Sequence, residues 1–173
     1  MREFTPLDEA AARPFRHGVG GTWSVDATDT KVAGKPVYGY RAIDGRGHVV
    51  GVYVSERRAT ADAATFFRRA SEATAVVPDA VTTACAAAYT PALAAVLPGV
   101  LHETGKHVQQ RIERDHQHLK GRLRPMRGFK TLAGARVVCR AHAFLRNLQG
   151  QFHDLGRPDD MATPSPLPPM VRA

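Results

Sequence analysis

Cysteine is nearly absent from the sequence: Cys85 and Cys139 are far apart and form no CxxC pair. This scarcity argues against a disulfide framework or a zinc site built on cysteine, and it fits a protein of the reducing cytosol. Long apolar runs are also lacking, because the most apolar stretch, residues 84–101, is interrupted by Pro91 and Pro98. A membrane span is therefore not expected, and neither is a signal peptide, since residues 1–18 have no apolar core.

Acidic residues are outnumbered by basic ones, with 16 Asp and Glu against 24 Lys and Arg, a net charge of +8 and a pI near 10.1. Such a balance favours a polyanionic partner, either nucleic acid or an acidic membrane face, although basic charge can also serve solubility alone. Nucleic acid is the partner that we expect. The 173 residues, 43% of them hydrophobic, suffice for one domain with a buried core.

Hydrophobic patterning predicts three strands at the start of the folded region. Residues 23–28 alternate apolar and polar side chains, and residues 37–43 and 48–55 are rich in β-branched and aromatic side chains. Since the turns between them are too short to join parallel strands, these three strands form an antiparallel meander. After them we expect helix, strand, helix, strand and two helices, at residues 60–73, 81–84, 90–97, 100–103, 109–120 and 132–148.

This order predicts an α/β protein with a mixed five-stranded sheet, an antiparallel meander plus parallel crossovers, flanked by helices. It matches the RNase H-like fold, which on patterning alone is one candidate among several. We divide the chain into a lead-in segment at residues 1–20, a folded domain at residues 21–155 and a Pro-rich tail without fixed structure at residues 156–173.

Two carboxylates stand out by their positions. Asp26 lies in the middle of the first predicted strand, where Asp is disfavoured, although it could simply face solvent. Glu113 lies on the polar helix and shares one predicted face with His116, Gln117 and Lys120. For helices in general, a charged face of this kind is more often only solvated.

A basic cluster surrounds Glu113 in the segment RIERDHQHLKGRLRPMRGFK. Its members are Arg111, Arg114, Lys120, Arg122, Arg124, Arg127 and Lys130. Such clustering suits contact with a phosphate backbone, although a basic helix can also pack on an acidic partner. The histidines of this region could suggest zinc, but they lack cysteine partners and a clear ligand spacing. We therefore expect His116, like Lys120, to face DNA phosphates.

Two long blocks of the sequence resemble the catalytic blocks of transposases in the insertion sequence six family. The first is WSVDATDTKVAGKPVYGYRAIDGRGHVVGVYVSERR, which is similar to W-x-V-D-E-T-Y-x-K-V followed by an aromatic-rich strand and R-A-V/I-D-x-x-G. The second is RIERDHQHLKGRLRPMRGFKTLAGARVVCRAHAFLRN, which is similar to N-N-x-I-E-x-D-H-x-x-L/I-K-x-R-x-R-P-M-x-G. The resemblance covers residues 4–155, and two long blocks in the right order are far more specific than a lone D-x-T.

The resemblance implies a DDE enzyme, in which three carboxylates hold two divalent metal ions, usually Mg²⁺. One metal ion activates water or a DNA 3′-hydroxyl, and the other stabilises the leaving oxygen during in-line displacement at phosphorus. Asp26 would be the first carboxylate and Glu113 the last, both as metal ligands. The implied partners are double-stranded DNA at transposon ends and either a second copy or an intact transposase, in the cytoplasm at the nucleoid.

The sequence departs from the family pattern at the second carboxylate. The family places this Asp in a T-D-x-x-x-x-Y context, and alignment on Tyr89 puts Ala84 at its position. Asp79 lies five positions earlier, and the odd offset turns it to the opposite face of the strand. Gln109 and Gln110 replace the usual Asn pair. The helix-turn-helix region of active members would lie before this sequence.

The sequence therefore predicts a transposase catalytic domain for Mg²⁺-dependent DNA strand transfer that is N-terminally truncated and inactive, because the methyl group of Ala84 cannot bind a metal ion. The alternative is a non-catalytic DNA-binding or dimerising relic that modulates an intact transposase. A weaker alternative is an RNase H-like nuclease, which the missing Asp disfavours.

Overall fold

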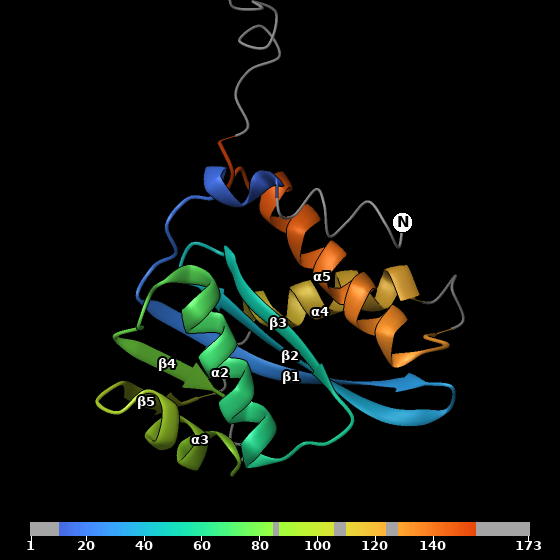
Figure 1. The fold of residues 1–173 in the computed structure, drawn as a ribbon, viewed down its shortest axis with the longest axis horizontal. Helices are drawn as coiled ribbons and strands as arrows, with labels where there is room; N and C mark the ends of the chain where they lie inside the picture. The colour runs from blue at the N-terminus through green and yellow to red at the C-terminus, as the bar shows by residue number, and fades with distance from the viewer. Residues whose placement is uncertain (1–10, 85–86, 106–109, 124–127, 155–173) are drawn as a thin grey trace, which may run out of the picture.

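The structure of the protein, a computed structural model, describes residues 11–84, 87–105, 110–123 and 128–154. The predicted tail, residues 156–173, lies outside them. The described residues form one mixed five-stranded sheet in the order β3-β2-β1-β4-β5, with helices around it (Figure 1). The strands are β1 (Thr22–Val32), β2 (Lys35–Asp44), β3 (Val49–Ser55), β4 (Ala80–Thr83) and β5 (Leu101–Thr104).

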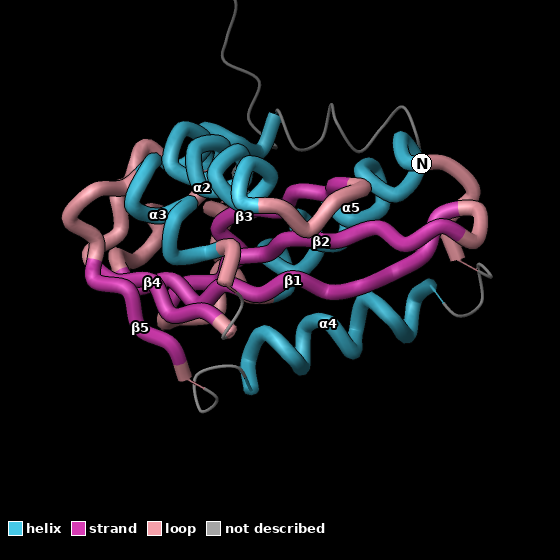
Figure 2. Tube along the Cα trace, turned by 90° about the horizontal axis from the view of Figure 1, so that it is seen from below, coloured by secondary structure: helices cyan, strands magenta, loops and turns pink. Residues whose placement is uncertain are grey.

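The pairing of the strands confirms the predicted fold class. β1, β2 and β3 form an antiparallel meander, whereas β4 pairs parallel with β1, and β5 pairs parallel with β4. A short 3₁₀ helix (Arg13–Phe15) precedes the sheet, and the helices that follow are α2 (Thr60–Thr74), α3 (Tyr89–Val96), α4 (Gln110–Leu123) and α5 (Leu132–Gln149). α2 and α3 lie over one face of the sheet, α4 runs along the other beneath β1, and α5 packs against β3 (Figure 2). Among the described helices, none has the length and hydropathy of a membrane span.

Strand β1 is longer than the sequence predicts. It continues past residue 28 to Val32, and Asp29 and Lys31 both pair with β2. The sequence does not reveal this extension, because Asp29 and Lys31 interrupt the apolar alternation. The last pairs of this ladder, which ends at Val32 opposite Lys35, lie beyond the end of β3. β1 and β2 therefore project from the sheet as a two-stranded arm, residues 30–37, which Figure 1 shows in blue at the far end from β4 and β5.

Three hydrophobic clusters of described residues hold the layers together. The largest one lies between the sheet and the α2–α3 layer, and Trp23, Phe66 and Tyr89 are among its buried members. A small one, of Ile43, Val49 and Ile112, joins α4 to β2 and β3. The remaining one, which we call the arm cluster, joins the arm to α4 and α5. Its buried members are Val32, Val37, Val54, Leu119, Phe129, Ala135 and Cys139. Cys139 is a free thiol in this apolar setting, whereas Cys85 lies outside the described residues.

The described part of the predicted lead-in, residues 11–20, belongs to the folded domain. Arg16 donates a hydrogen bond from Nε to Nε2 of His48 at 3.0 Å, and its guanidinium also donates to two carbonyl oxygens of β3. The His48 ring stacks on that of Phe152, with centroids 4.6 Å apart. The first and last described segments are therefore joined through β3.

We predict that His48 makes stability depend on pH. Burial and the neighbouring Arg16 guanidinium lower the pKa of His48 from 6.5 to about 4, so the ring stays neutral and accepts the Arg16 hydrogen bond. Because the unfolded state binds the proton more readily, this contribution is complete above about pH 6.5 and is lost as the pH falls toward about 4. Urea midpoints at about pH 7 and about pH 5 should show the loss.

Two variants isolate the effect of this histidine. His48→Gln should lose much of the difference between the two midpoints, since an amide does not titrate. His118→Gln, on the exposed side of α4, should keep the difference. The same pH dependence in the parent and in His48→Gln would contradict the prediction.

Candidate active site

Asp26 points from β1 toward α4. Along β1 the side chains of Trp23, Val25 and Ala27 are buried against the α2–α3 layer, so Asp26 faces the other side of the sheet. Its Oδ1 accepts a hydrogen bond from the Ala27 N–H at 2.8 Å, and its Oδ2 lies 3.7 Å from Nδ1 of His116. The Asp26 side chain is 18% exposed, so it is held between sheet and helix but remains open to solvent.

The pKa of Asp26 reflects a crowded site. Burial raises this pKa above its ordinary value of 3.8, and the negative charges of Glu113 and Asp29 add to the effect. The Ala27 N–H and the Arg58 guanidinium, which lies 3.9 Å from Asp29, oppose it. The charge of Glu113, the second carboxylate that the sequence singled out, therefore acts on Asp26.

The residues that share one predicted face of α4 divide between its buried and exposed sides. Ile112, His116 and Leu119 are buried, whereas Glu113 and Lys120 are exposed. His116 is only 7% exposed and faces Asp26, so contact of this side chain with DNA phosphates stays a prediction that its burial does not favour.

Ala84 lies at the register position next to Asp26. The parallel β1–β4 ladder ends with Val25 opposite Thr83, so the next residues of the two strands are Asp26 and Ala84. Asp79 comes before β4, at the other end of this ladder. It therefore cannot supply a carboxylate beside Asp26.

The residues of this site do not make up a two-metal centre. Hard divalent cations such as Mg²⁺ bind through oxygen ligands, chiefly carboxylates and water. Asp26 and Glu113 offer two carboxylates, while Ala84 offers only a methyl group. In the part of the chain that the structure describes, no group of three His, Cys, Asp or Glu side chains is placed to hold a metal ion. Among the described residues, Asp26 and Glu113 are therefore the only carboxylates singled out at this site.

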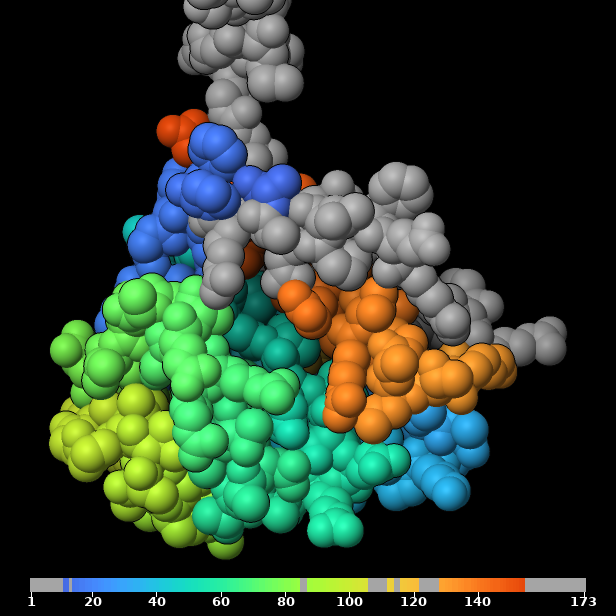
Figure 3. Space-filling view, in the orientation of Figure 1, coloured from blue at the N-terminus to red at the C-terminus, as the bar shows by residue number. Residues whose placement is uncertain are grey.

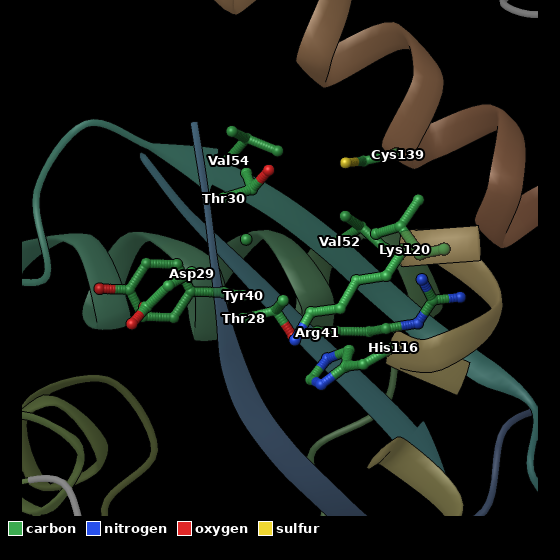
Figure 4. A pocket seen from close by; sticks show the side chains of 12 residues that line it. Thr28, Asp29, Thr30, Tyr40, Arg41, Val52, Val54, His116, Lys120 and Cys139 are labelled. Atoms are coloured by element: carbon green, nitrogen blue, oxygen red, sulfur yellow. The ribbon is translucent and has the colours of Figure 1, made fainter. Parts of the chain in front are cut away.

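A small pocket of about 30 Å³ lies between the sheet and α4, and His116, which faces Asp26, is among the residues that line it. Thr28 and Arg41 line it from the sheet, and His116 and Lys120 line it from α4 (Figure 4). Sequence reasoning missed Arg41, which lies opposite Asp26 in the β1–β2 register and is 2% exposed. The sequence feature that could have identified Arg41 is a charged residue within an otherwise apolar predicted strand. The pocket admits water rather than a nucleotide.

The predicted phosphate-binding cluster is described only in part. Lys120 and Lys130 are described, and both are exposed. The remaining members lie outside the described residues, either wholly or in their side chains: Arg111, Arg114, Arg122, Arg124 and Arg127. Their role in binding phosphates stays a prediction.

The sheet and its flanking helices define an RNase H-like fold, which retroviral integrase catalytic cores share. The HTLV-2 integrase catalytic core domain in complex with magnesium, in a dimeric form, matches with a TM-score of 0.54 at 17% identity, over 72% of this chain and 85% of that one. The BIV integrase catalytic core domain matches with a TM-score of 0.54 at 19% identity, over 73% and 83%. A chain of the simian T-cell lymphotropic virus intasome reaches 0.60 at 18% identity, over 92% and 62%. At these identities the likeness shows the fold alone.

Sequence comparison shows the family. The profile of a family described as a DDE domain, that of IS240-type transposases, matches residues 20–151. The transposases of the insertion sequence-like element IS431mec and of IS257 in transposon Tn4003, both from Staphylococcus aureus, are 33% identical to this chain over 105 residues. Those alignments cover 58% of this chain and 46% of each relative, so the chain spans about half the length of the curated relatives it matches. The chain belongs to the DDE transposase domains of the insertion sequence six family.

If Glu113 and Asp26 share one site, Glu113→Gln should lower the pKa of Asp26, because the substitution removes a neighbouring negative charge. An NMR titration of the Asp26 carboxyl carbon measures the direction. Glu103→Gln is the matched control, since Glu103 is an exposed residue of β5 and is not among the charges that act on Asp26. An Asp26 pKa that moves equally in both variants, or in neither, would place Glu113 elsewhere.

Proposed function

We propose that this chain is a DNA-binding transposase domain whose strand-transfer centre has lost its second metal-binding carboxylate, at Ala84. One juxtaposition supports the proposal: Asp26 and Ala84 occupy neighbouring register positions, and Glu113 acts on Asp26 from α4. Asp26 and Glu113 would be the first and last carboxylates of the family's triad. Membership of the family supports DNA transposition as the process in which the chain takes part.

Loss of a shared ligand accounts for the proposed loss of chemistry. Mg²⁺ would be the cation, since the remaining donors, on Asp26 and Glu113, are carboxylate oxygens. A well-placed metal ion stabilises the transition state by several kcal/mol, and each ~1.4 kcal/mol corresponds to a tenfold rate. An alanine in place of a bridging aspartate should therefore lower the rate by orders of magnitude and leave the fold intact.

The same substitution favours a second candidate function, in which the chain acts only by binding DNA or by pairing with an intact transposase. The two candidates share a DNA-binding surface. They differ in whether one added carboxylate at position 84 can rebuild the metal site. An RNase H-like nuclease is disfavoured, because it would need the same metal ligands.

The distribution of charge supports DNA as the partner. No acidic residue occurs between Asp115 and Asp154, a stretch with eight Lys and Arg residues that supplies half of α4 and all of α5. Charge of a single sign suits a phosphate backbone and gives binding without sequence preference. The DNA would be that of transposon ends, and the protein partner a second copy or an intact transposase.

We predict that Ala84→Asp restores metal binding. A third carboxylate beside Asp26 should lower the melting temperature of the metal-free variant through like-charge repulsion. Mn²⁺ or Mg²⁺ should then raise that temperature more than it raises the parent's, because a ligand that binds only the folded state stabilises it by mass action. The measurement is the melting temperature of both proteins with and without Mn²⁺.

Ala84→Asn is the matched control, because it adds a side chain of the same size without the charge. Its melting temperature should respond to Mn²⁺ much as the parent's does. An equal Mn²⁺-induced shift in the parent and in Ala84→Asp would mean that Ala84 does not adjoin the site and that the alignment on Tyr89 is wrong. Melting is a better readout than strand transfer, which also requires recognition of transposon ends.

The parent should bind duplex DNA with little sequence preference and with a steep dependence on salt. Each phosphate neutralised by Lys or Arg contributes about 0.9 to the slope of log affinity against log salt concentration. Fluorescence anisotropy with two unrelated duplexes over a range of NaCl concentrations measures both properties. An affinity that stays constant from low to physiological salt would contradict a phosphate-dominated surface.

A further inference from the structure

The arm at residues 30–37 is braced against the rest of the domain. Its two-residue turn consists of Ala33 and Gly34, whose φ angles of 48° and 83° suit the twist of the flanking strands. The Ala33 N–H donates to the carbonyl oxygen of Phe129 at 2.9 Å, and Val32 forms a β-bridge with Phe129. The arm is therefore tied to the segment that leads into α5, and Figure 3 shows its blue surface beside the orange start of that helix.

Four exposed lysines surround the arm cluster. Three of its buried side chains, those of Val32, Leu119 and Phe129, each have an exposed lysine beside them in the chain or across the ladder. These lysines, which we call the lysine rim, are Lys31, Lys35, Lys120 and Lys130. Lys35 lies opposite Val32 on the same face of the arm, whereas Lys31, next to Val32 in β1, lies on the other face. The lysines therefore come from three separate parts of the sequence and lie on both faces of the arm.

Among the described residues, no acidic side chain forms an ion pair with a rim lysine. The ion pairs found there join Asp26, Asp29 and Asp44 to other groups. Like charges near one another repel and cost stability. Because no described ion pair offsets this repulsion, the rim fits a polyanion that brings negative charge.

We propose that the lysine rim binds the phosphate backbone of duplex DNA next to the carboxylate site, so that the β1–β2 arm holds the DNA that flanks the reacting phosphate. The proposal rests on the proposed function, because it takes the polyanion to be the DNA of that site. It adds Lys31 and Lys35, which lie outside the basic cluster of the sequence analysis. Lysine suits this role, since an ammonium group on a flexible stem reaches phosphate oxygens without reading the base sequence.

β1 and α4 carry the candidate active site and also part of the lysine rim, and both elements run from the site toward the arm. His116 meets Asp26 early in β1, and the arm cluster joins the later parts of β1 and α4. The seven residues from Glu113 to Lys120 span about 10 Å of helix, and the five from Asp26 to Lys31 span about 17 Å of strand. At about 3.4 Å per base pair, the rim would meet phosphates roughly three to five base pairs from the carboxylates.

The test compares DNA binding by the parent chain and by Lys31→Ala/Lys35→Ala, measured by fluorescence anisotropy with one labelled duplex over a series of salt concentrations. Loss of two phosphate contacts should reduce the slope of log affinity against log salt by about 1.8 and weaken binding at low salt. Lys31→Arg/Lys35→Arg should keep the parent's slope. The melting temperature of the alanine variant should equal or exceed the parent's, whereas a structural role for these lysines would lower it.

Arg68→Gln/Arg69→Gln is the control for net charge, because it removes two exposed charges from α2, which contributes no side chain to the arm cluster. It should leave the slope unchanged. If the parent binds DNA but the slope is the same in Lys31→Ala/Lys35→Ala, or falls equally in the control, the arm is not part of the DNA surface and the proposed function still stands. If the parent binds no duplex at any salt concentration, the proposed function fails and the lysine rim fails with it.

Discussion

The pairing of β1 with β2 on one side and with β4 on the other fixes the position of every functional feature in this domain. β1 is where the antiparallel meander meets the parallel strands. Its alternation sends Trp23 and Val25 into the larger core and turns Asp26 toward α4. A slip of one residue would exchange these two sets of side chains, burying the carboxylate and exposing the tryptophan. The hydrophobic core therefore also positions the candidate active site.

The architecture could be predicted from the sequence because it depends on local signals. Short turns force the meander, and the runs of helix and strand after it leave few ways to complete the sheet. Asp26 stood out because aspartate is disfavoured in the middle of a predicted strand. Glu113 stood out because it shares one predicted helix face with other polar residues. The extent of β1 was missed because its last residues, Asp29 and Lys31, pair as strand but have the composition of a turn.

The surroundings of Asp26 could not be predicted, because they depend on which polar side chains tertiary packing buries. His116 and Arg41 are almost fully buried on the face that carries Asp26. Burying such groups is costly, and they occur most often where a site requires them. The hydrophobic periodicity of the sequence does not distinguish a buried histidine from an exposed one on a charged helix. Only the packing of α4 on the sheet does so.

Chemistry and DNA binding depend on this fold in different ways, and so they can be lost separately. A metal site needs each of its few carboxylates at one point, and those carboxylates repel one another until a cation is bound. In the proposed function, alanine at position 84 would relieve part of that repulsion while removing a donor, so a change that abolishes chemistry need not weaken the fold. Binding to a phosphate backbone is instead shared among many basic side chains, each of which contributes a little. A domain with an incomplete metal site can therefore keep its full DNA surface.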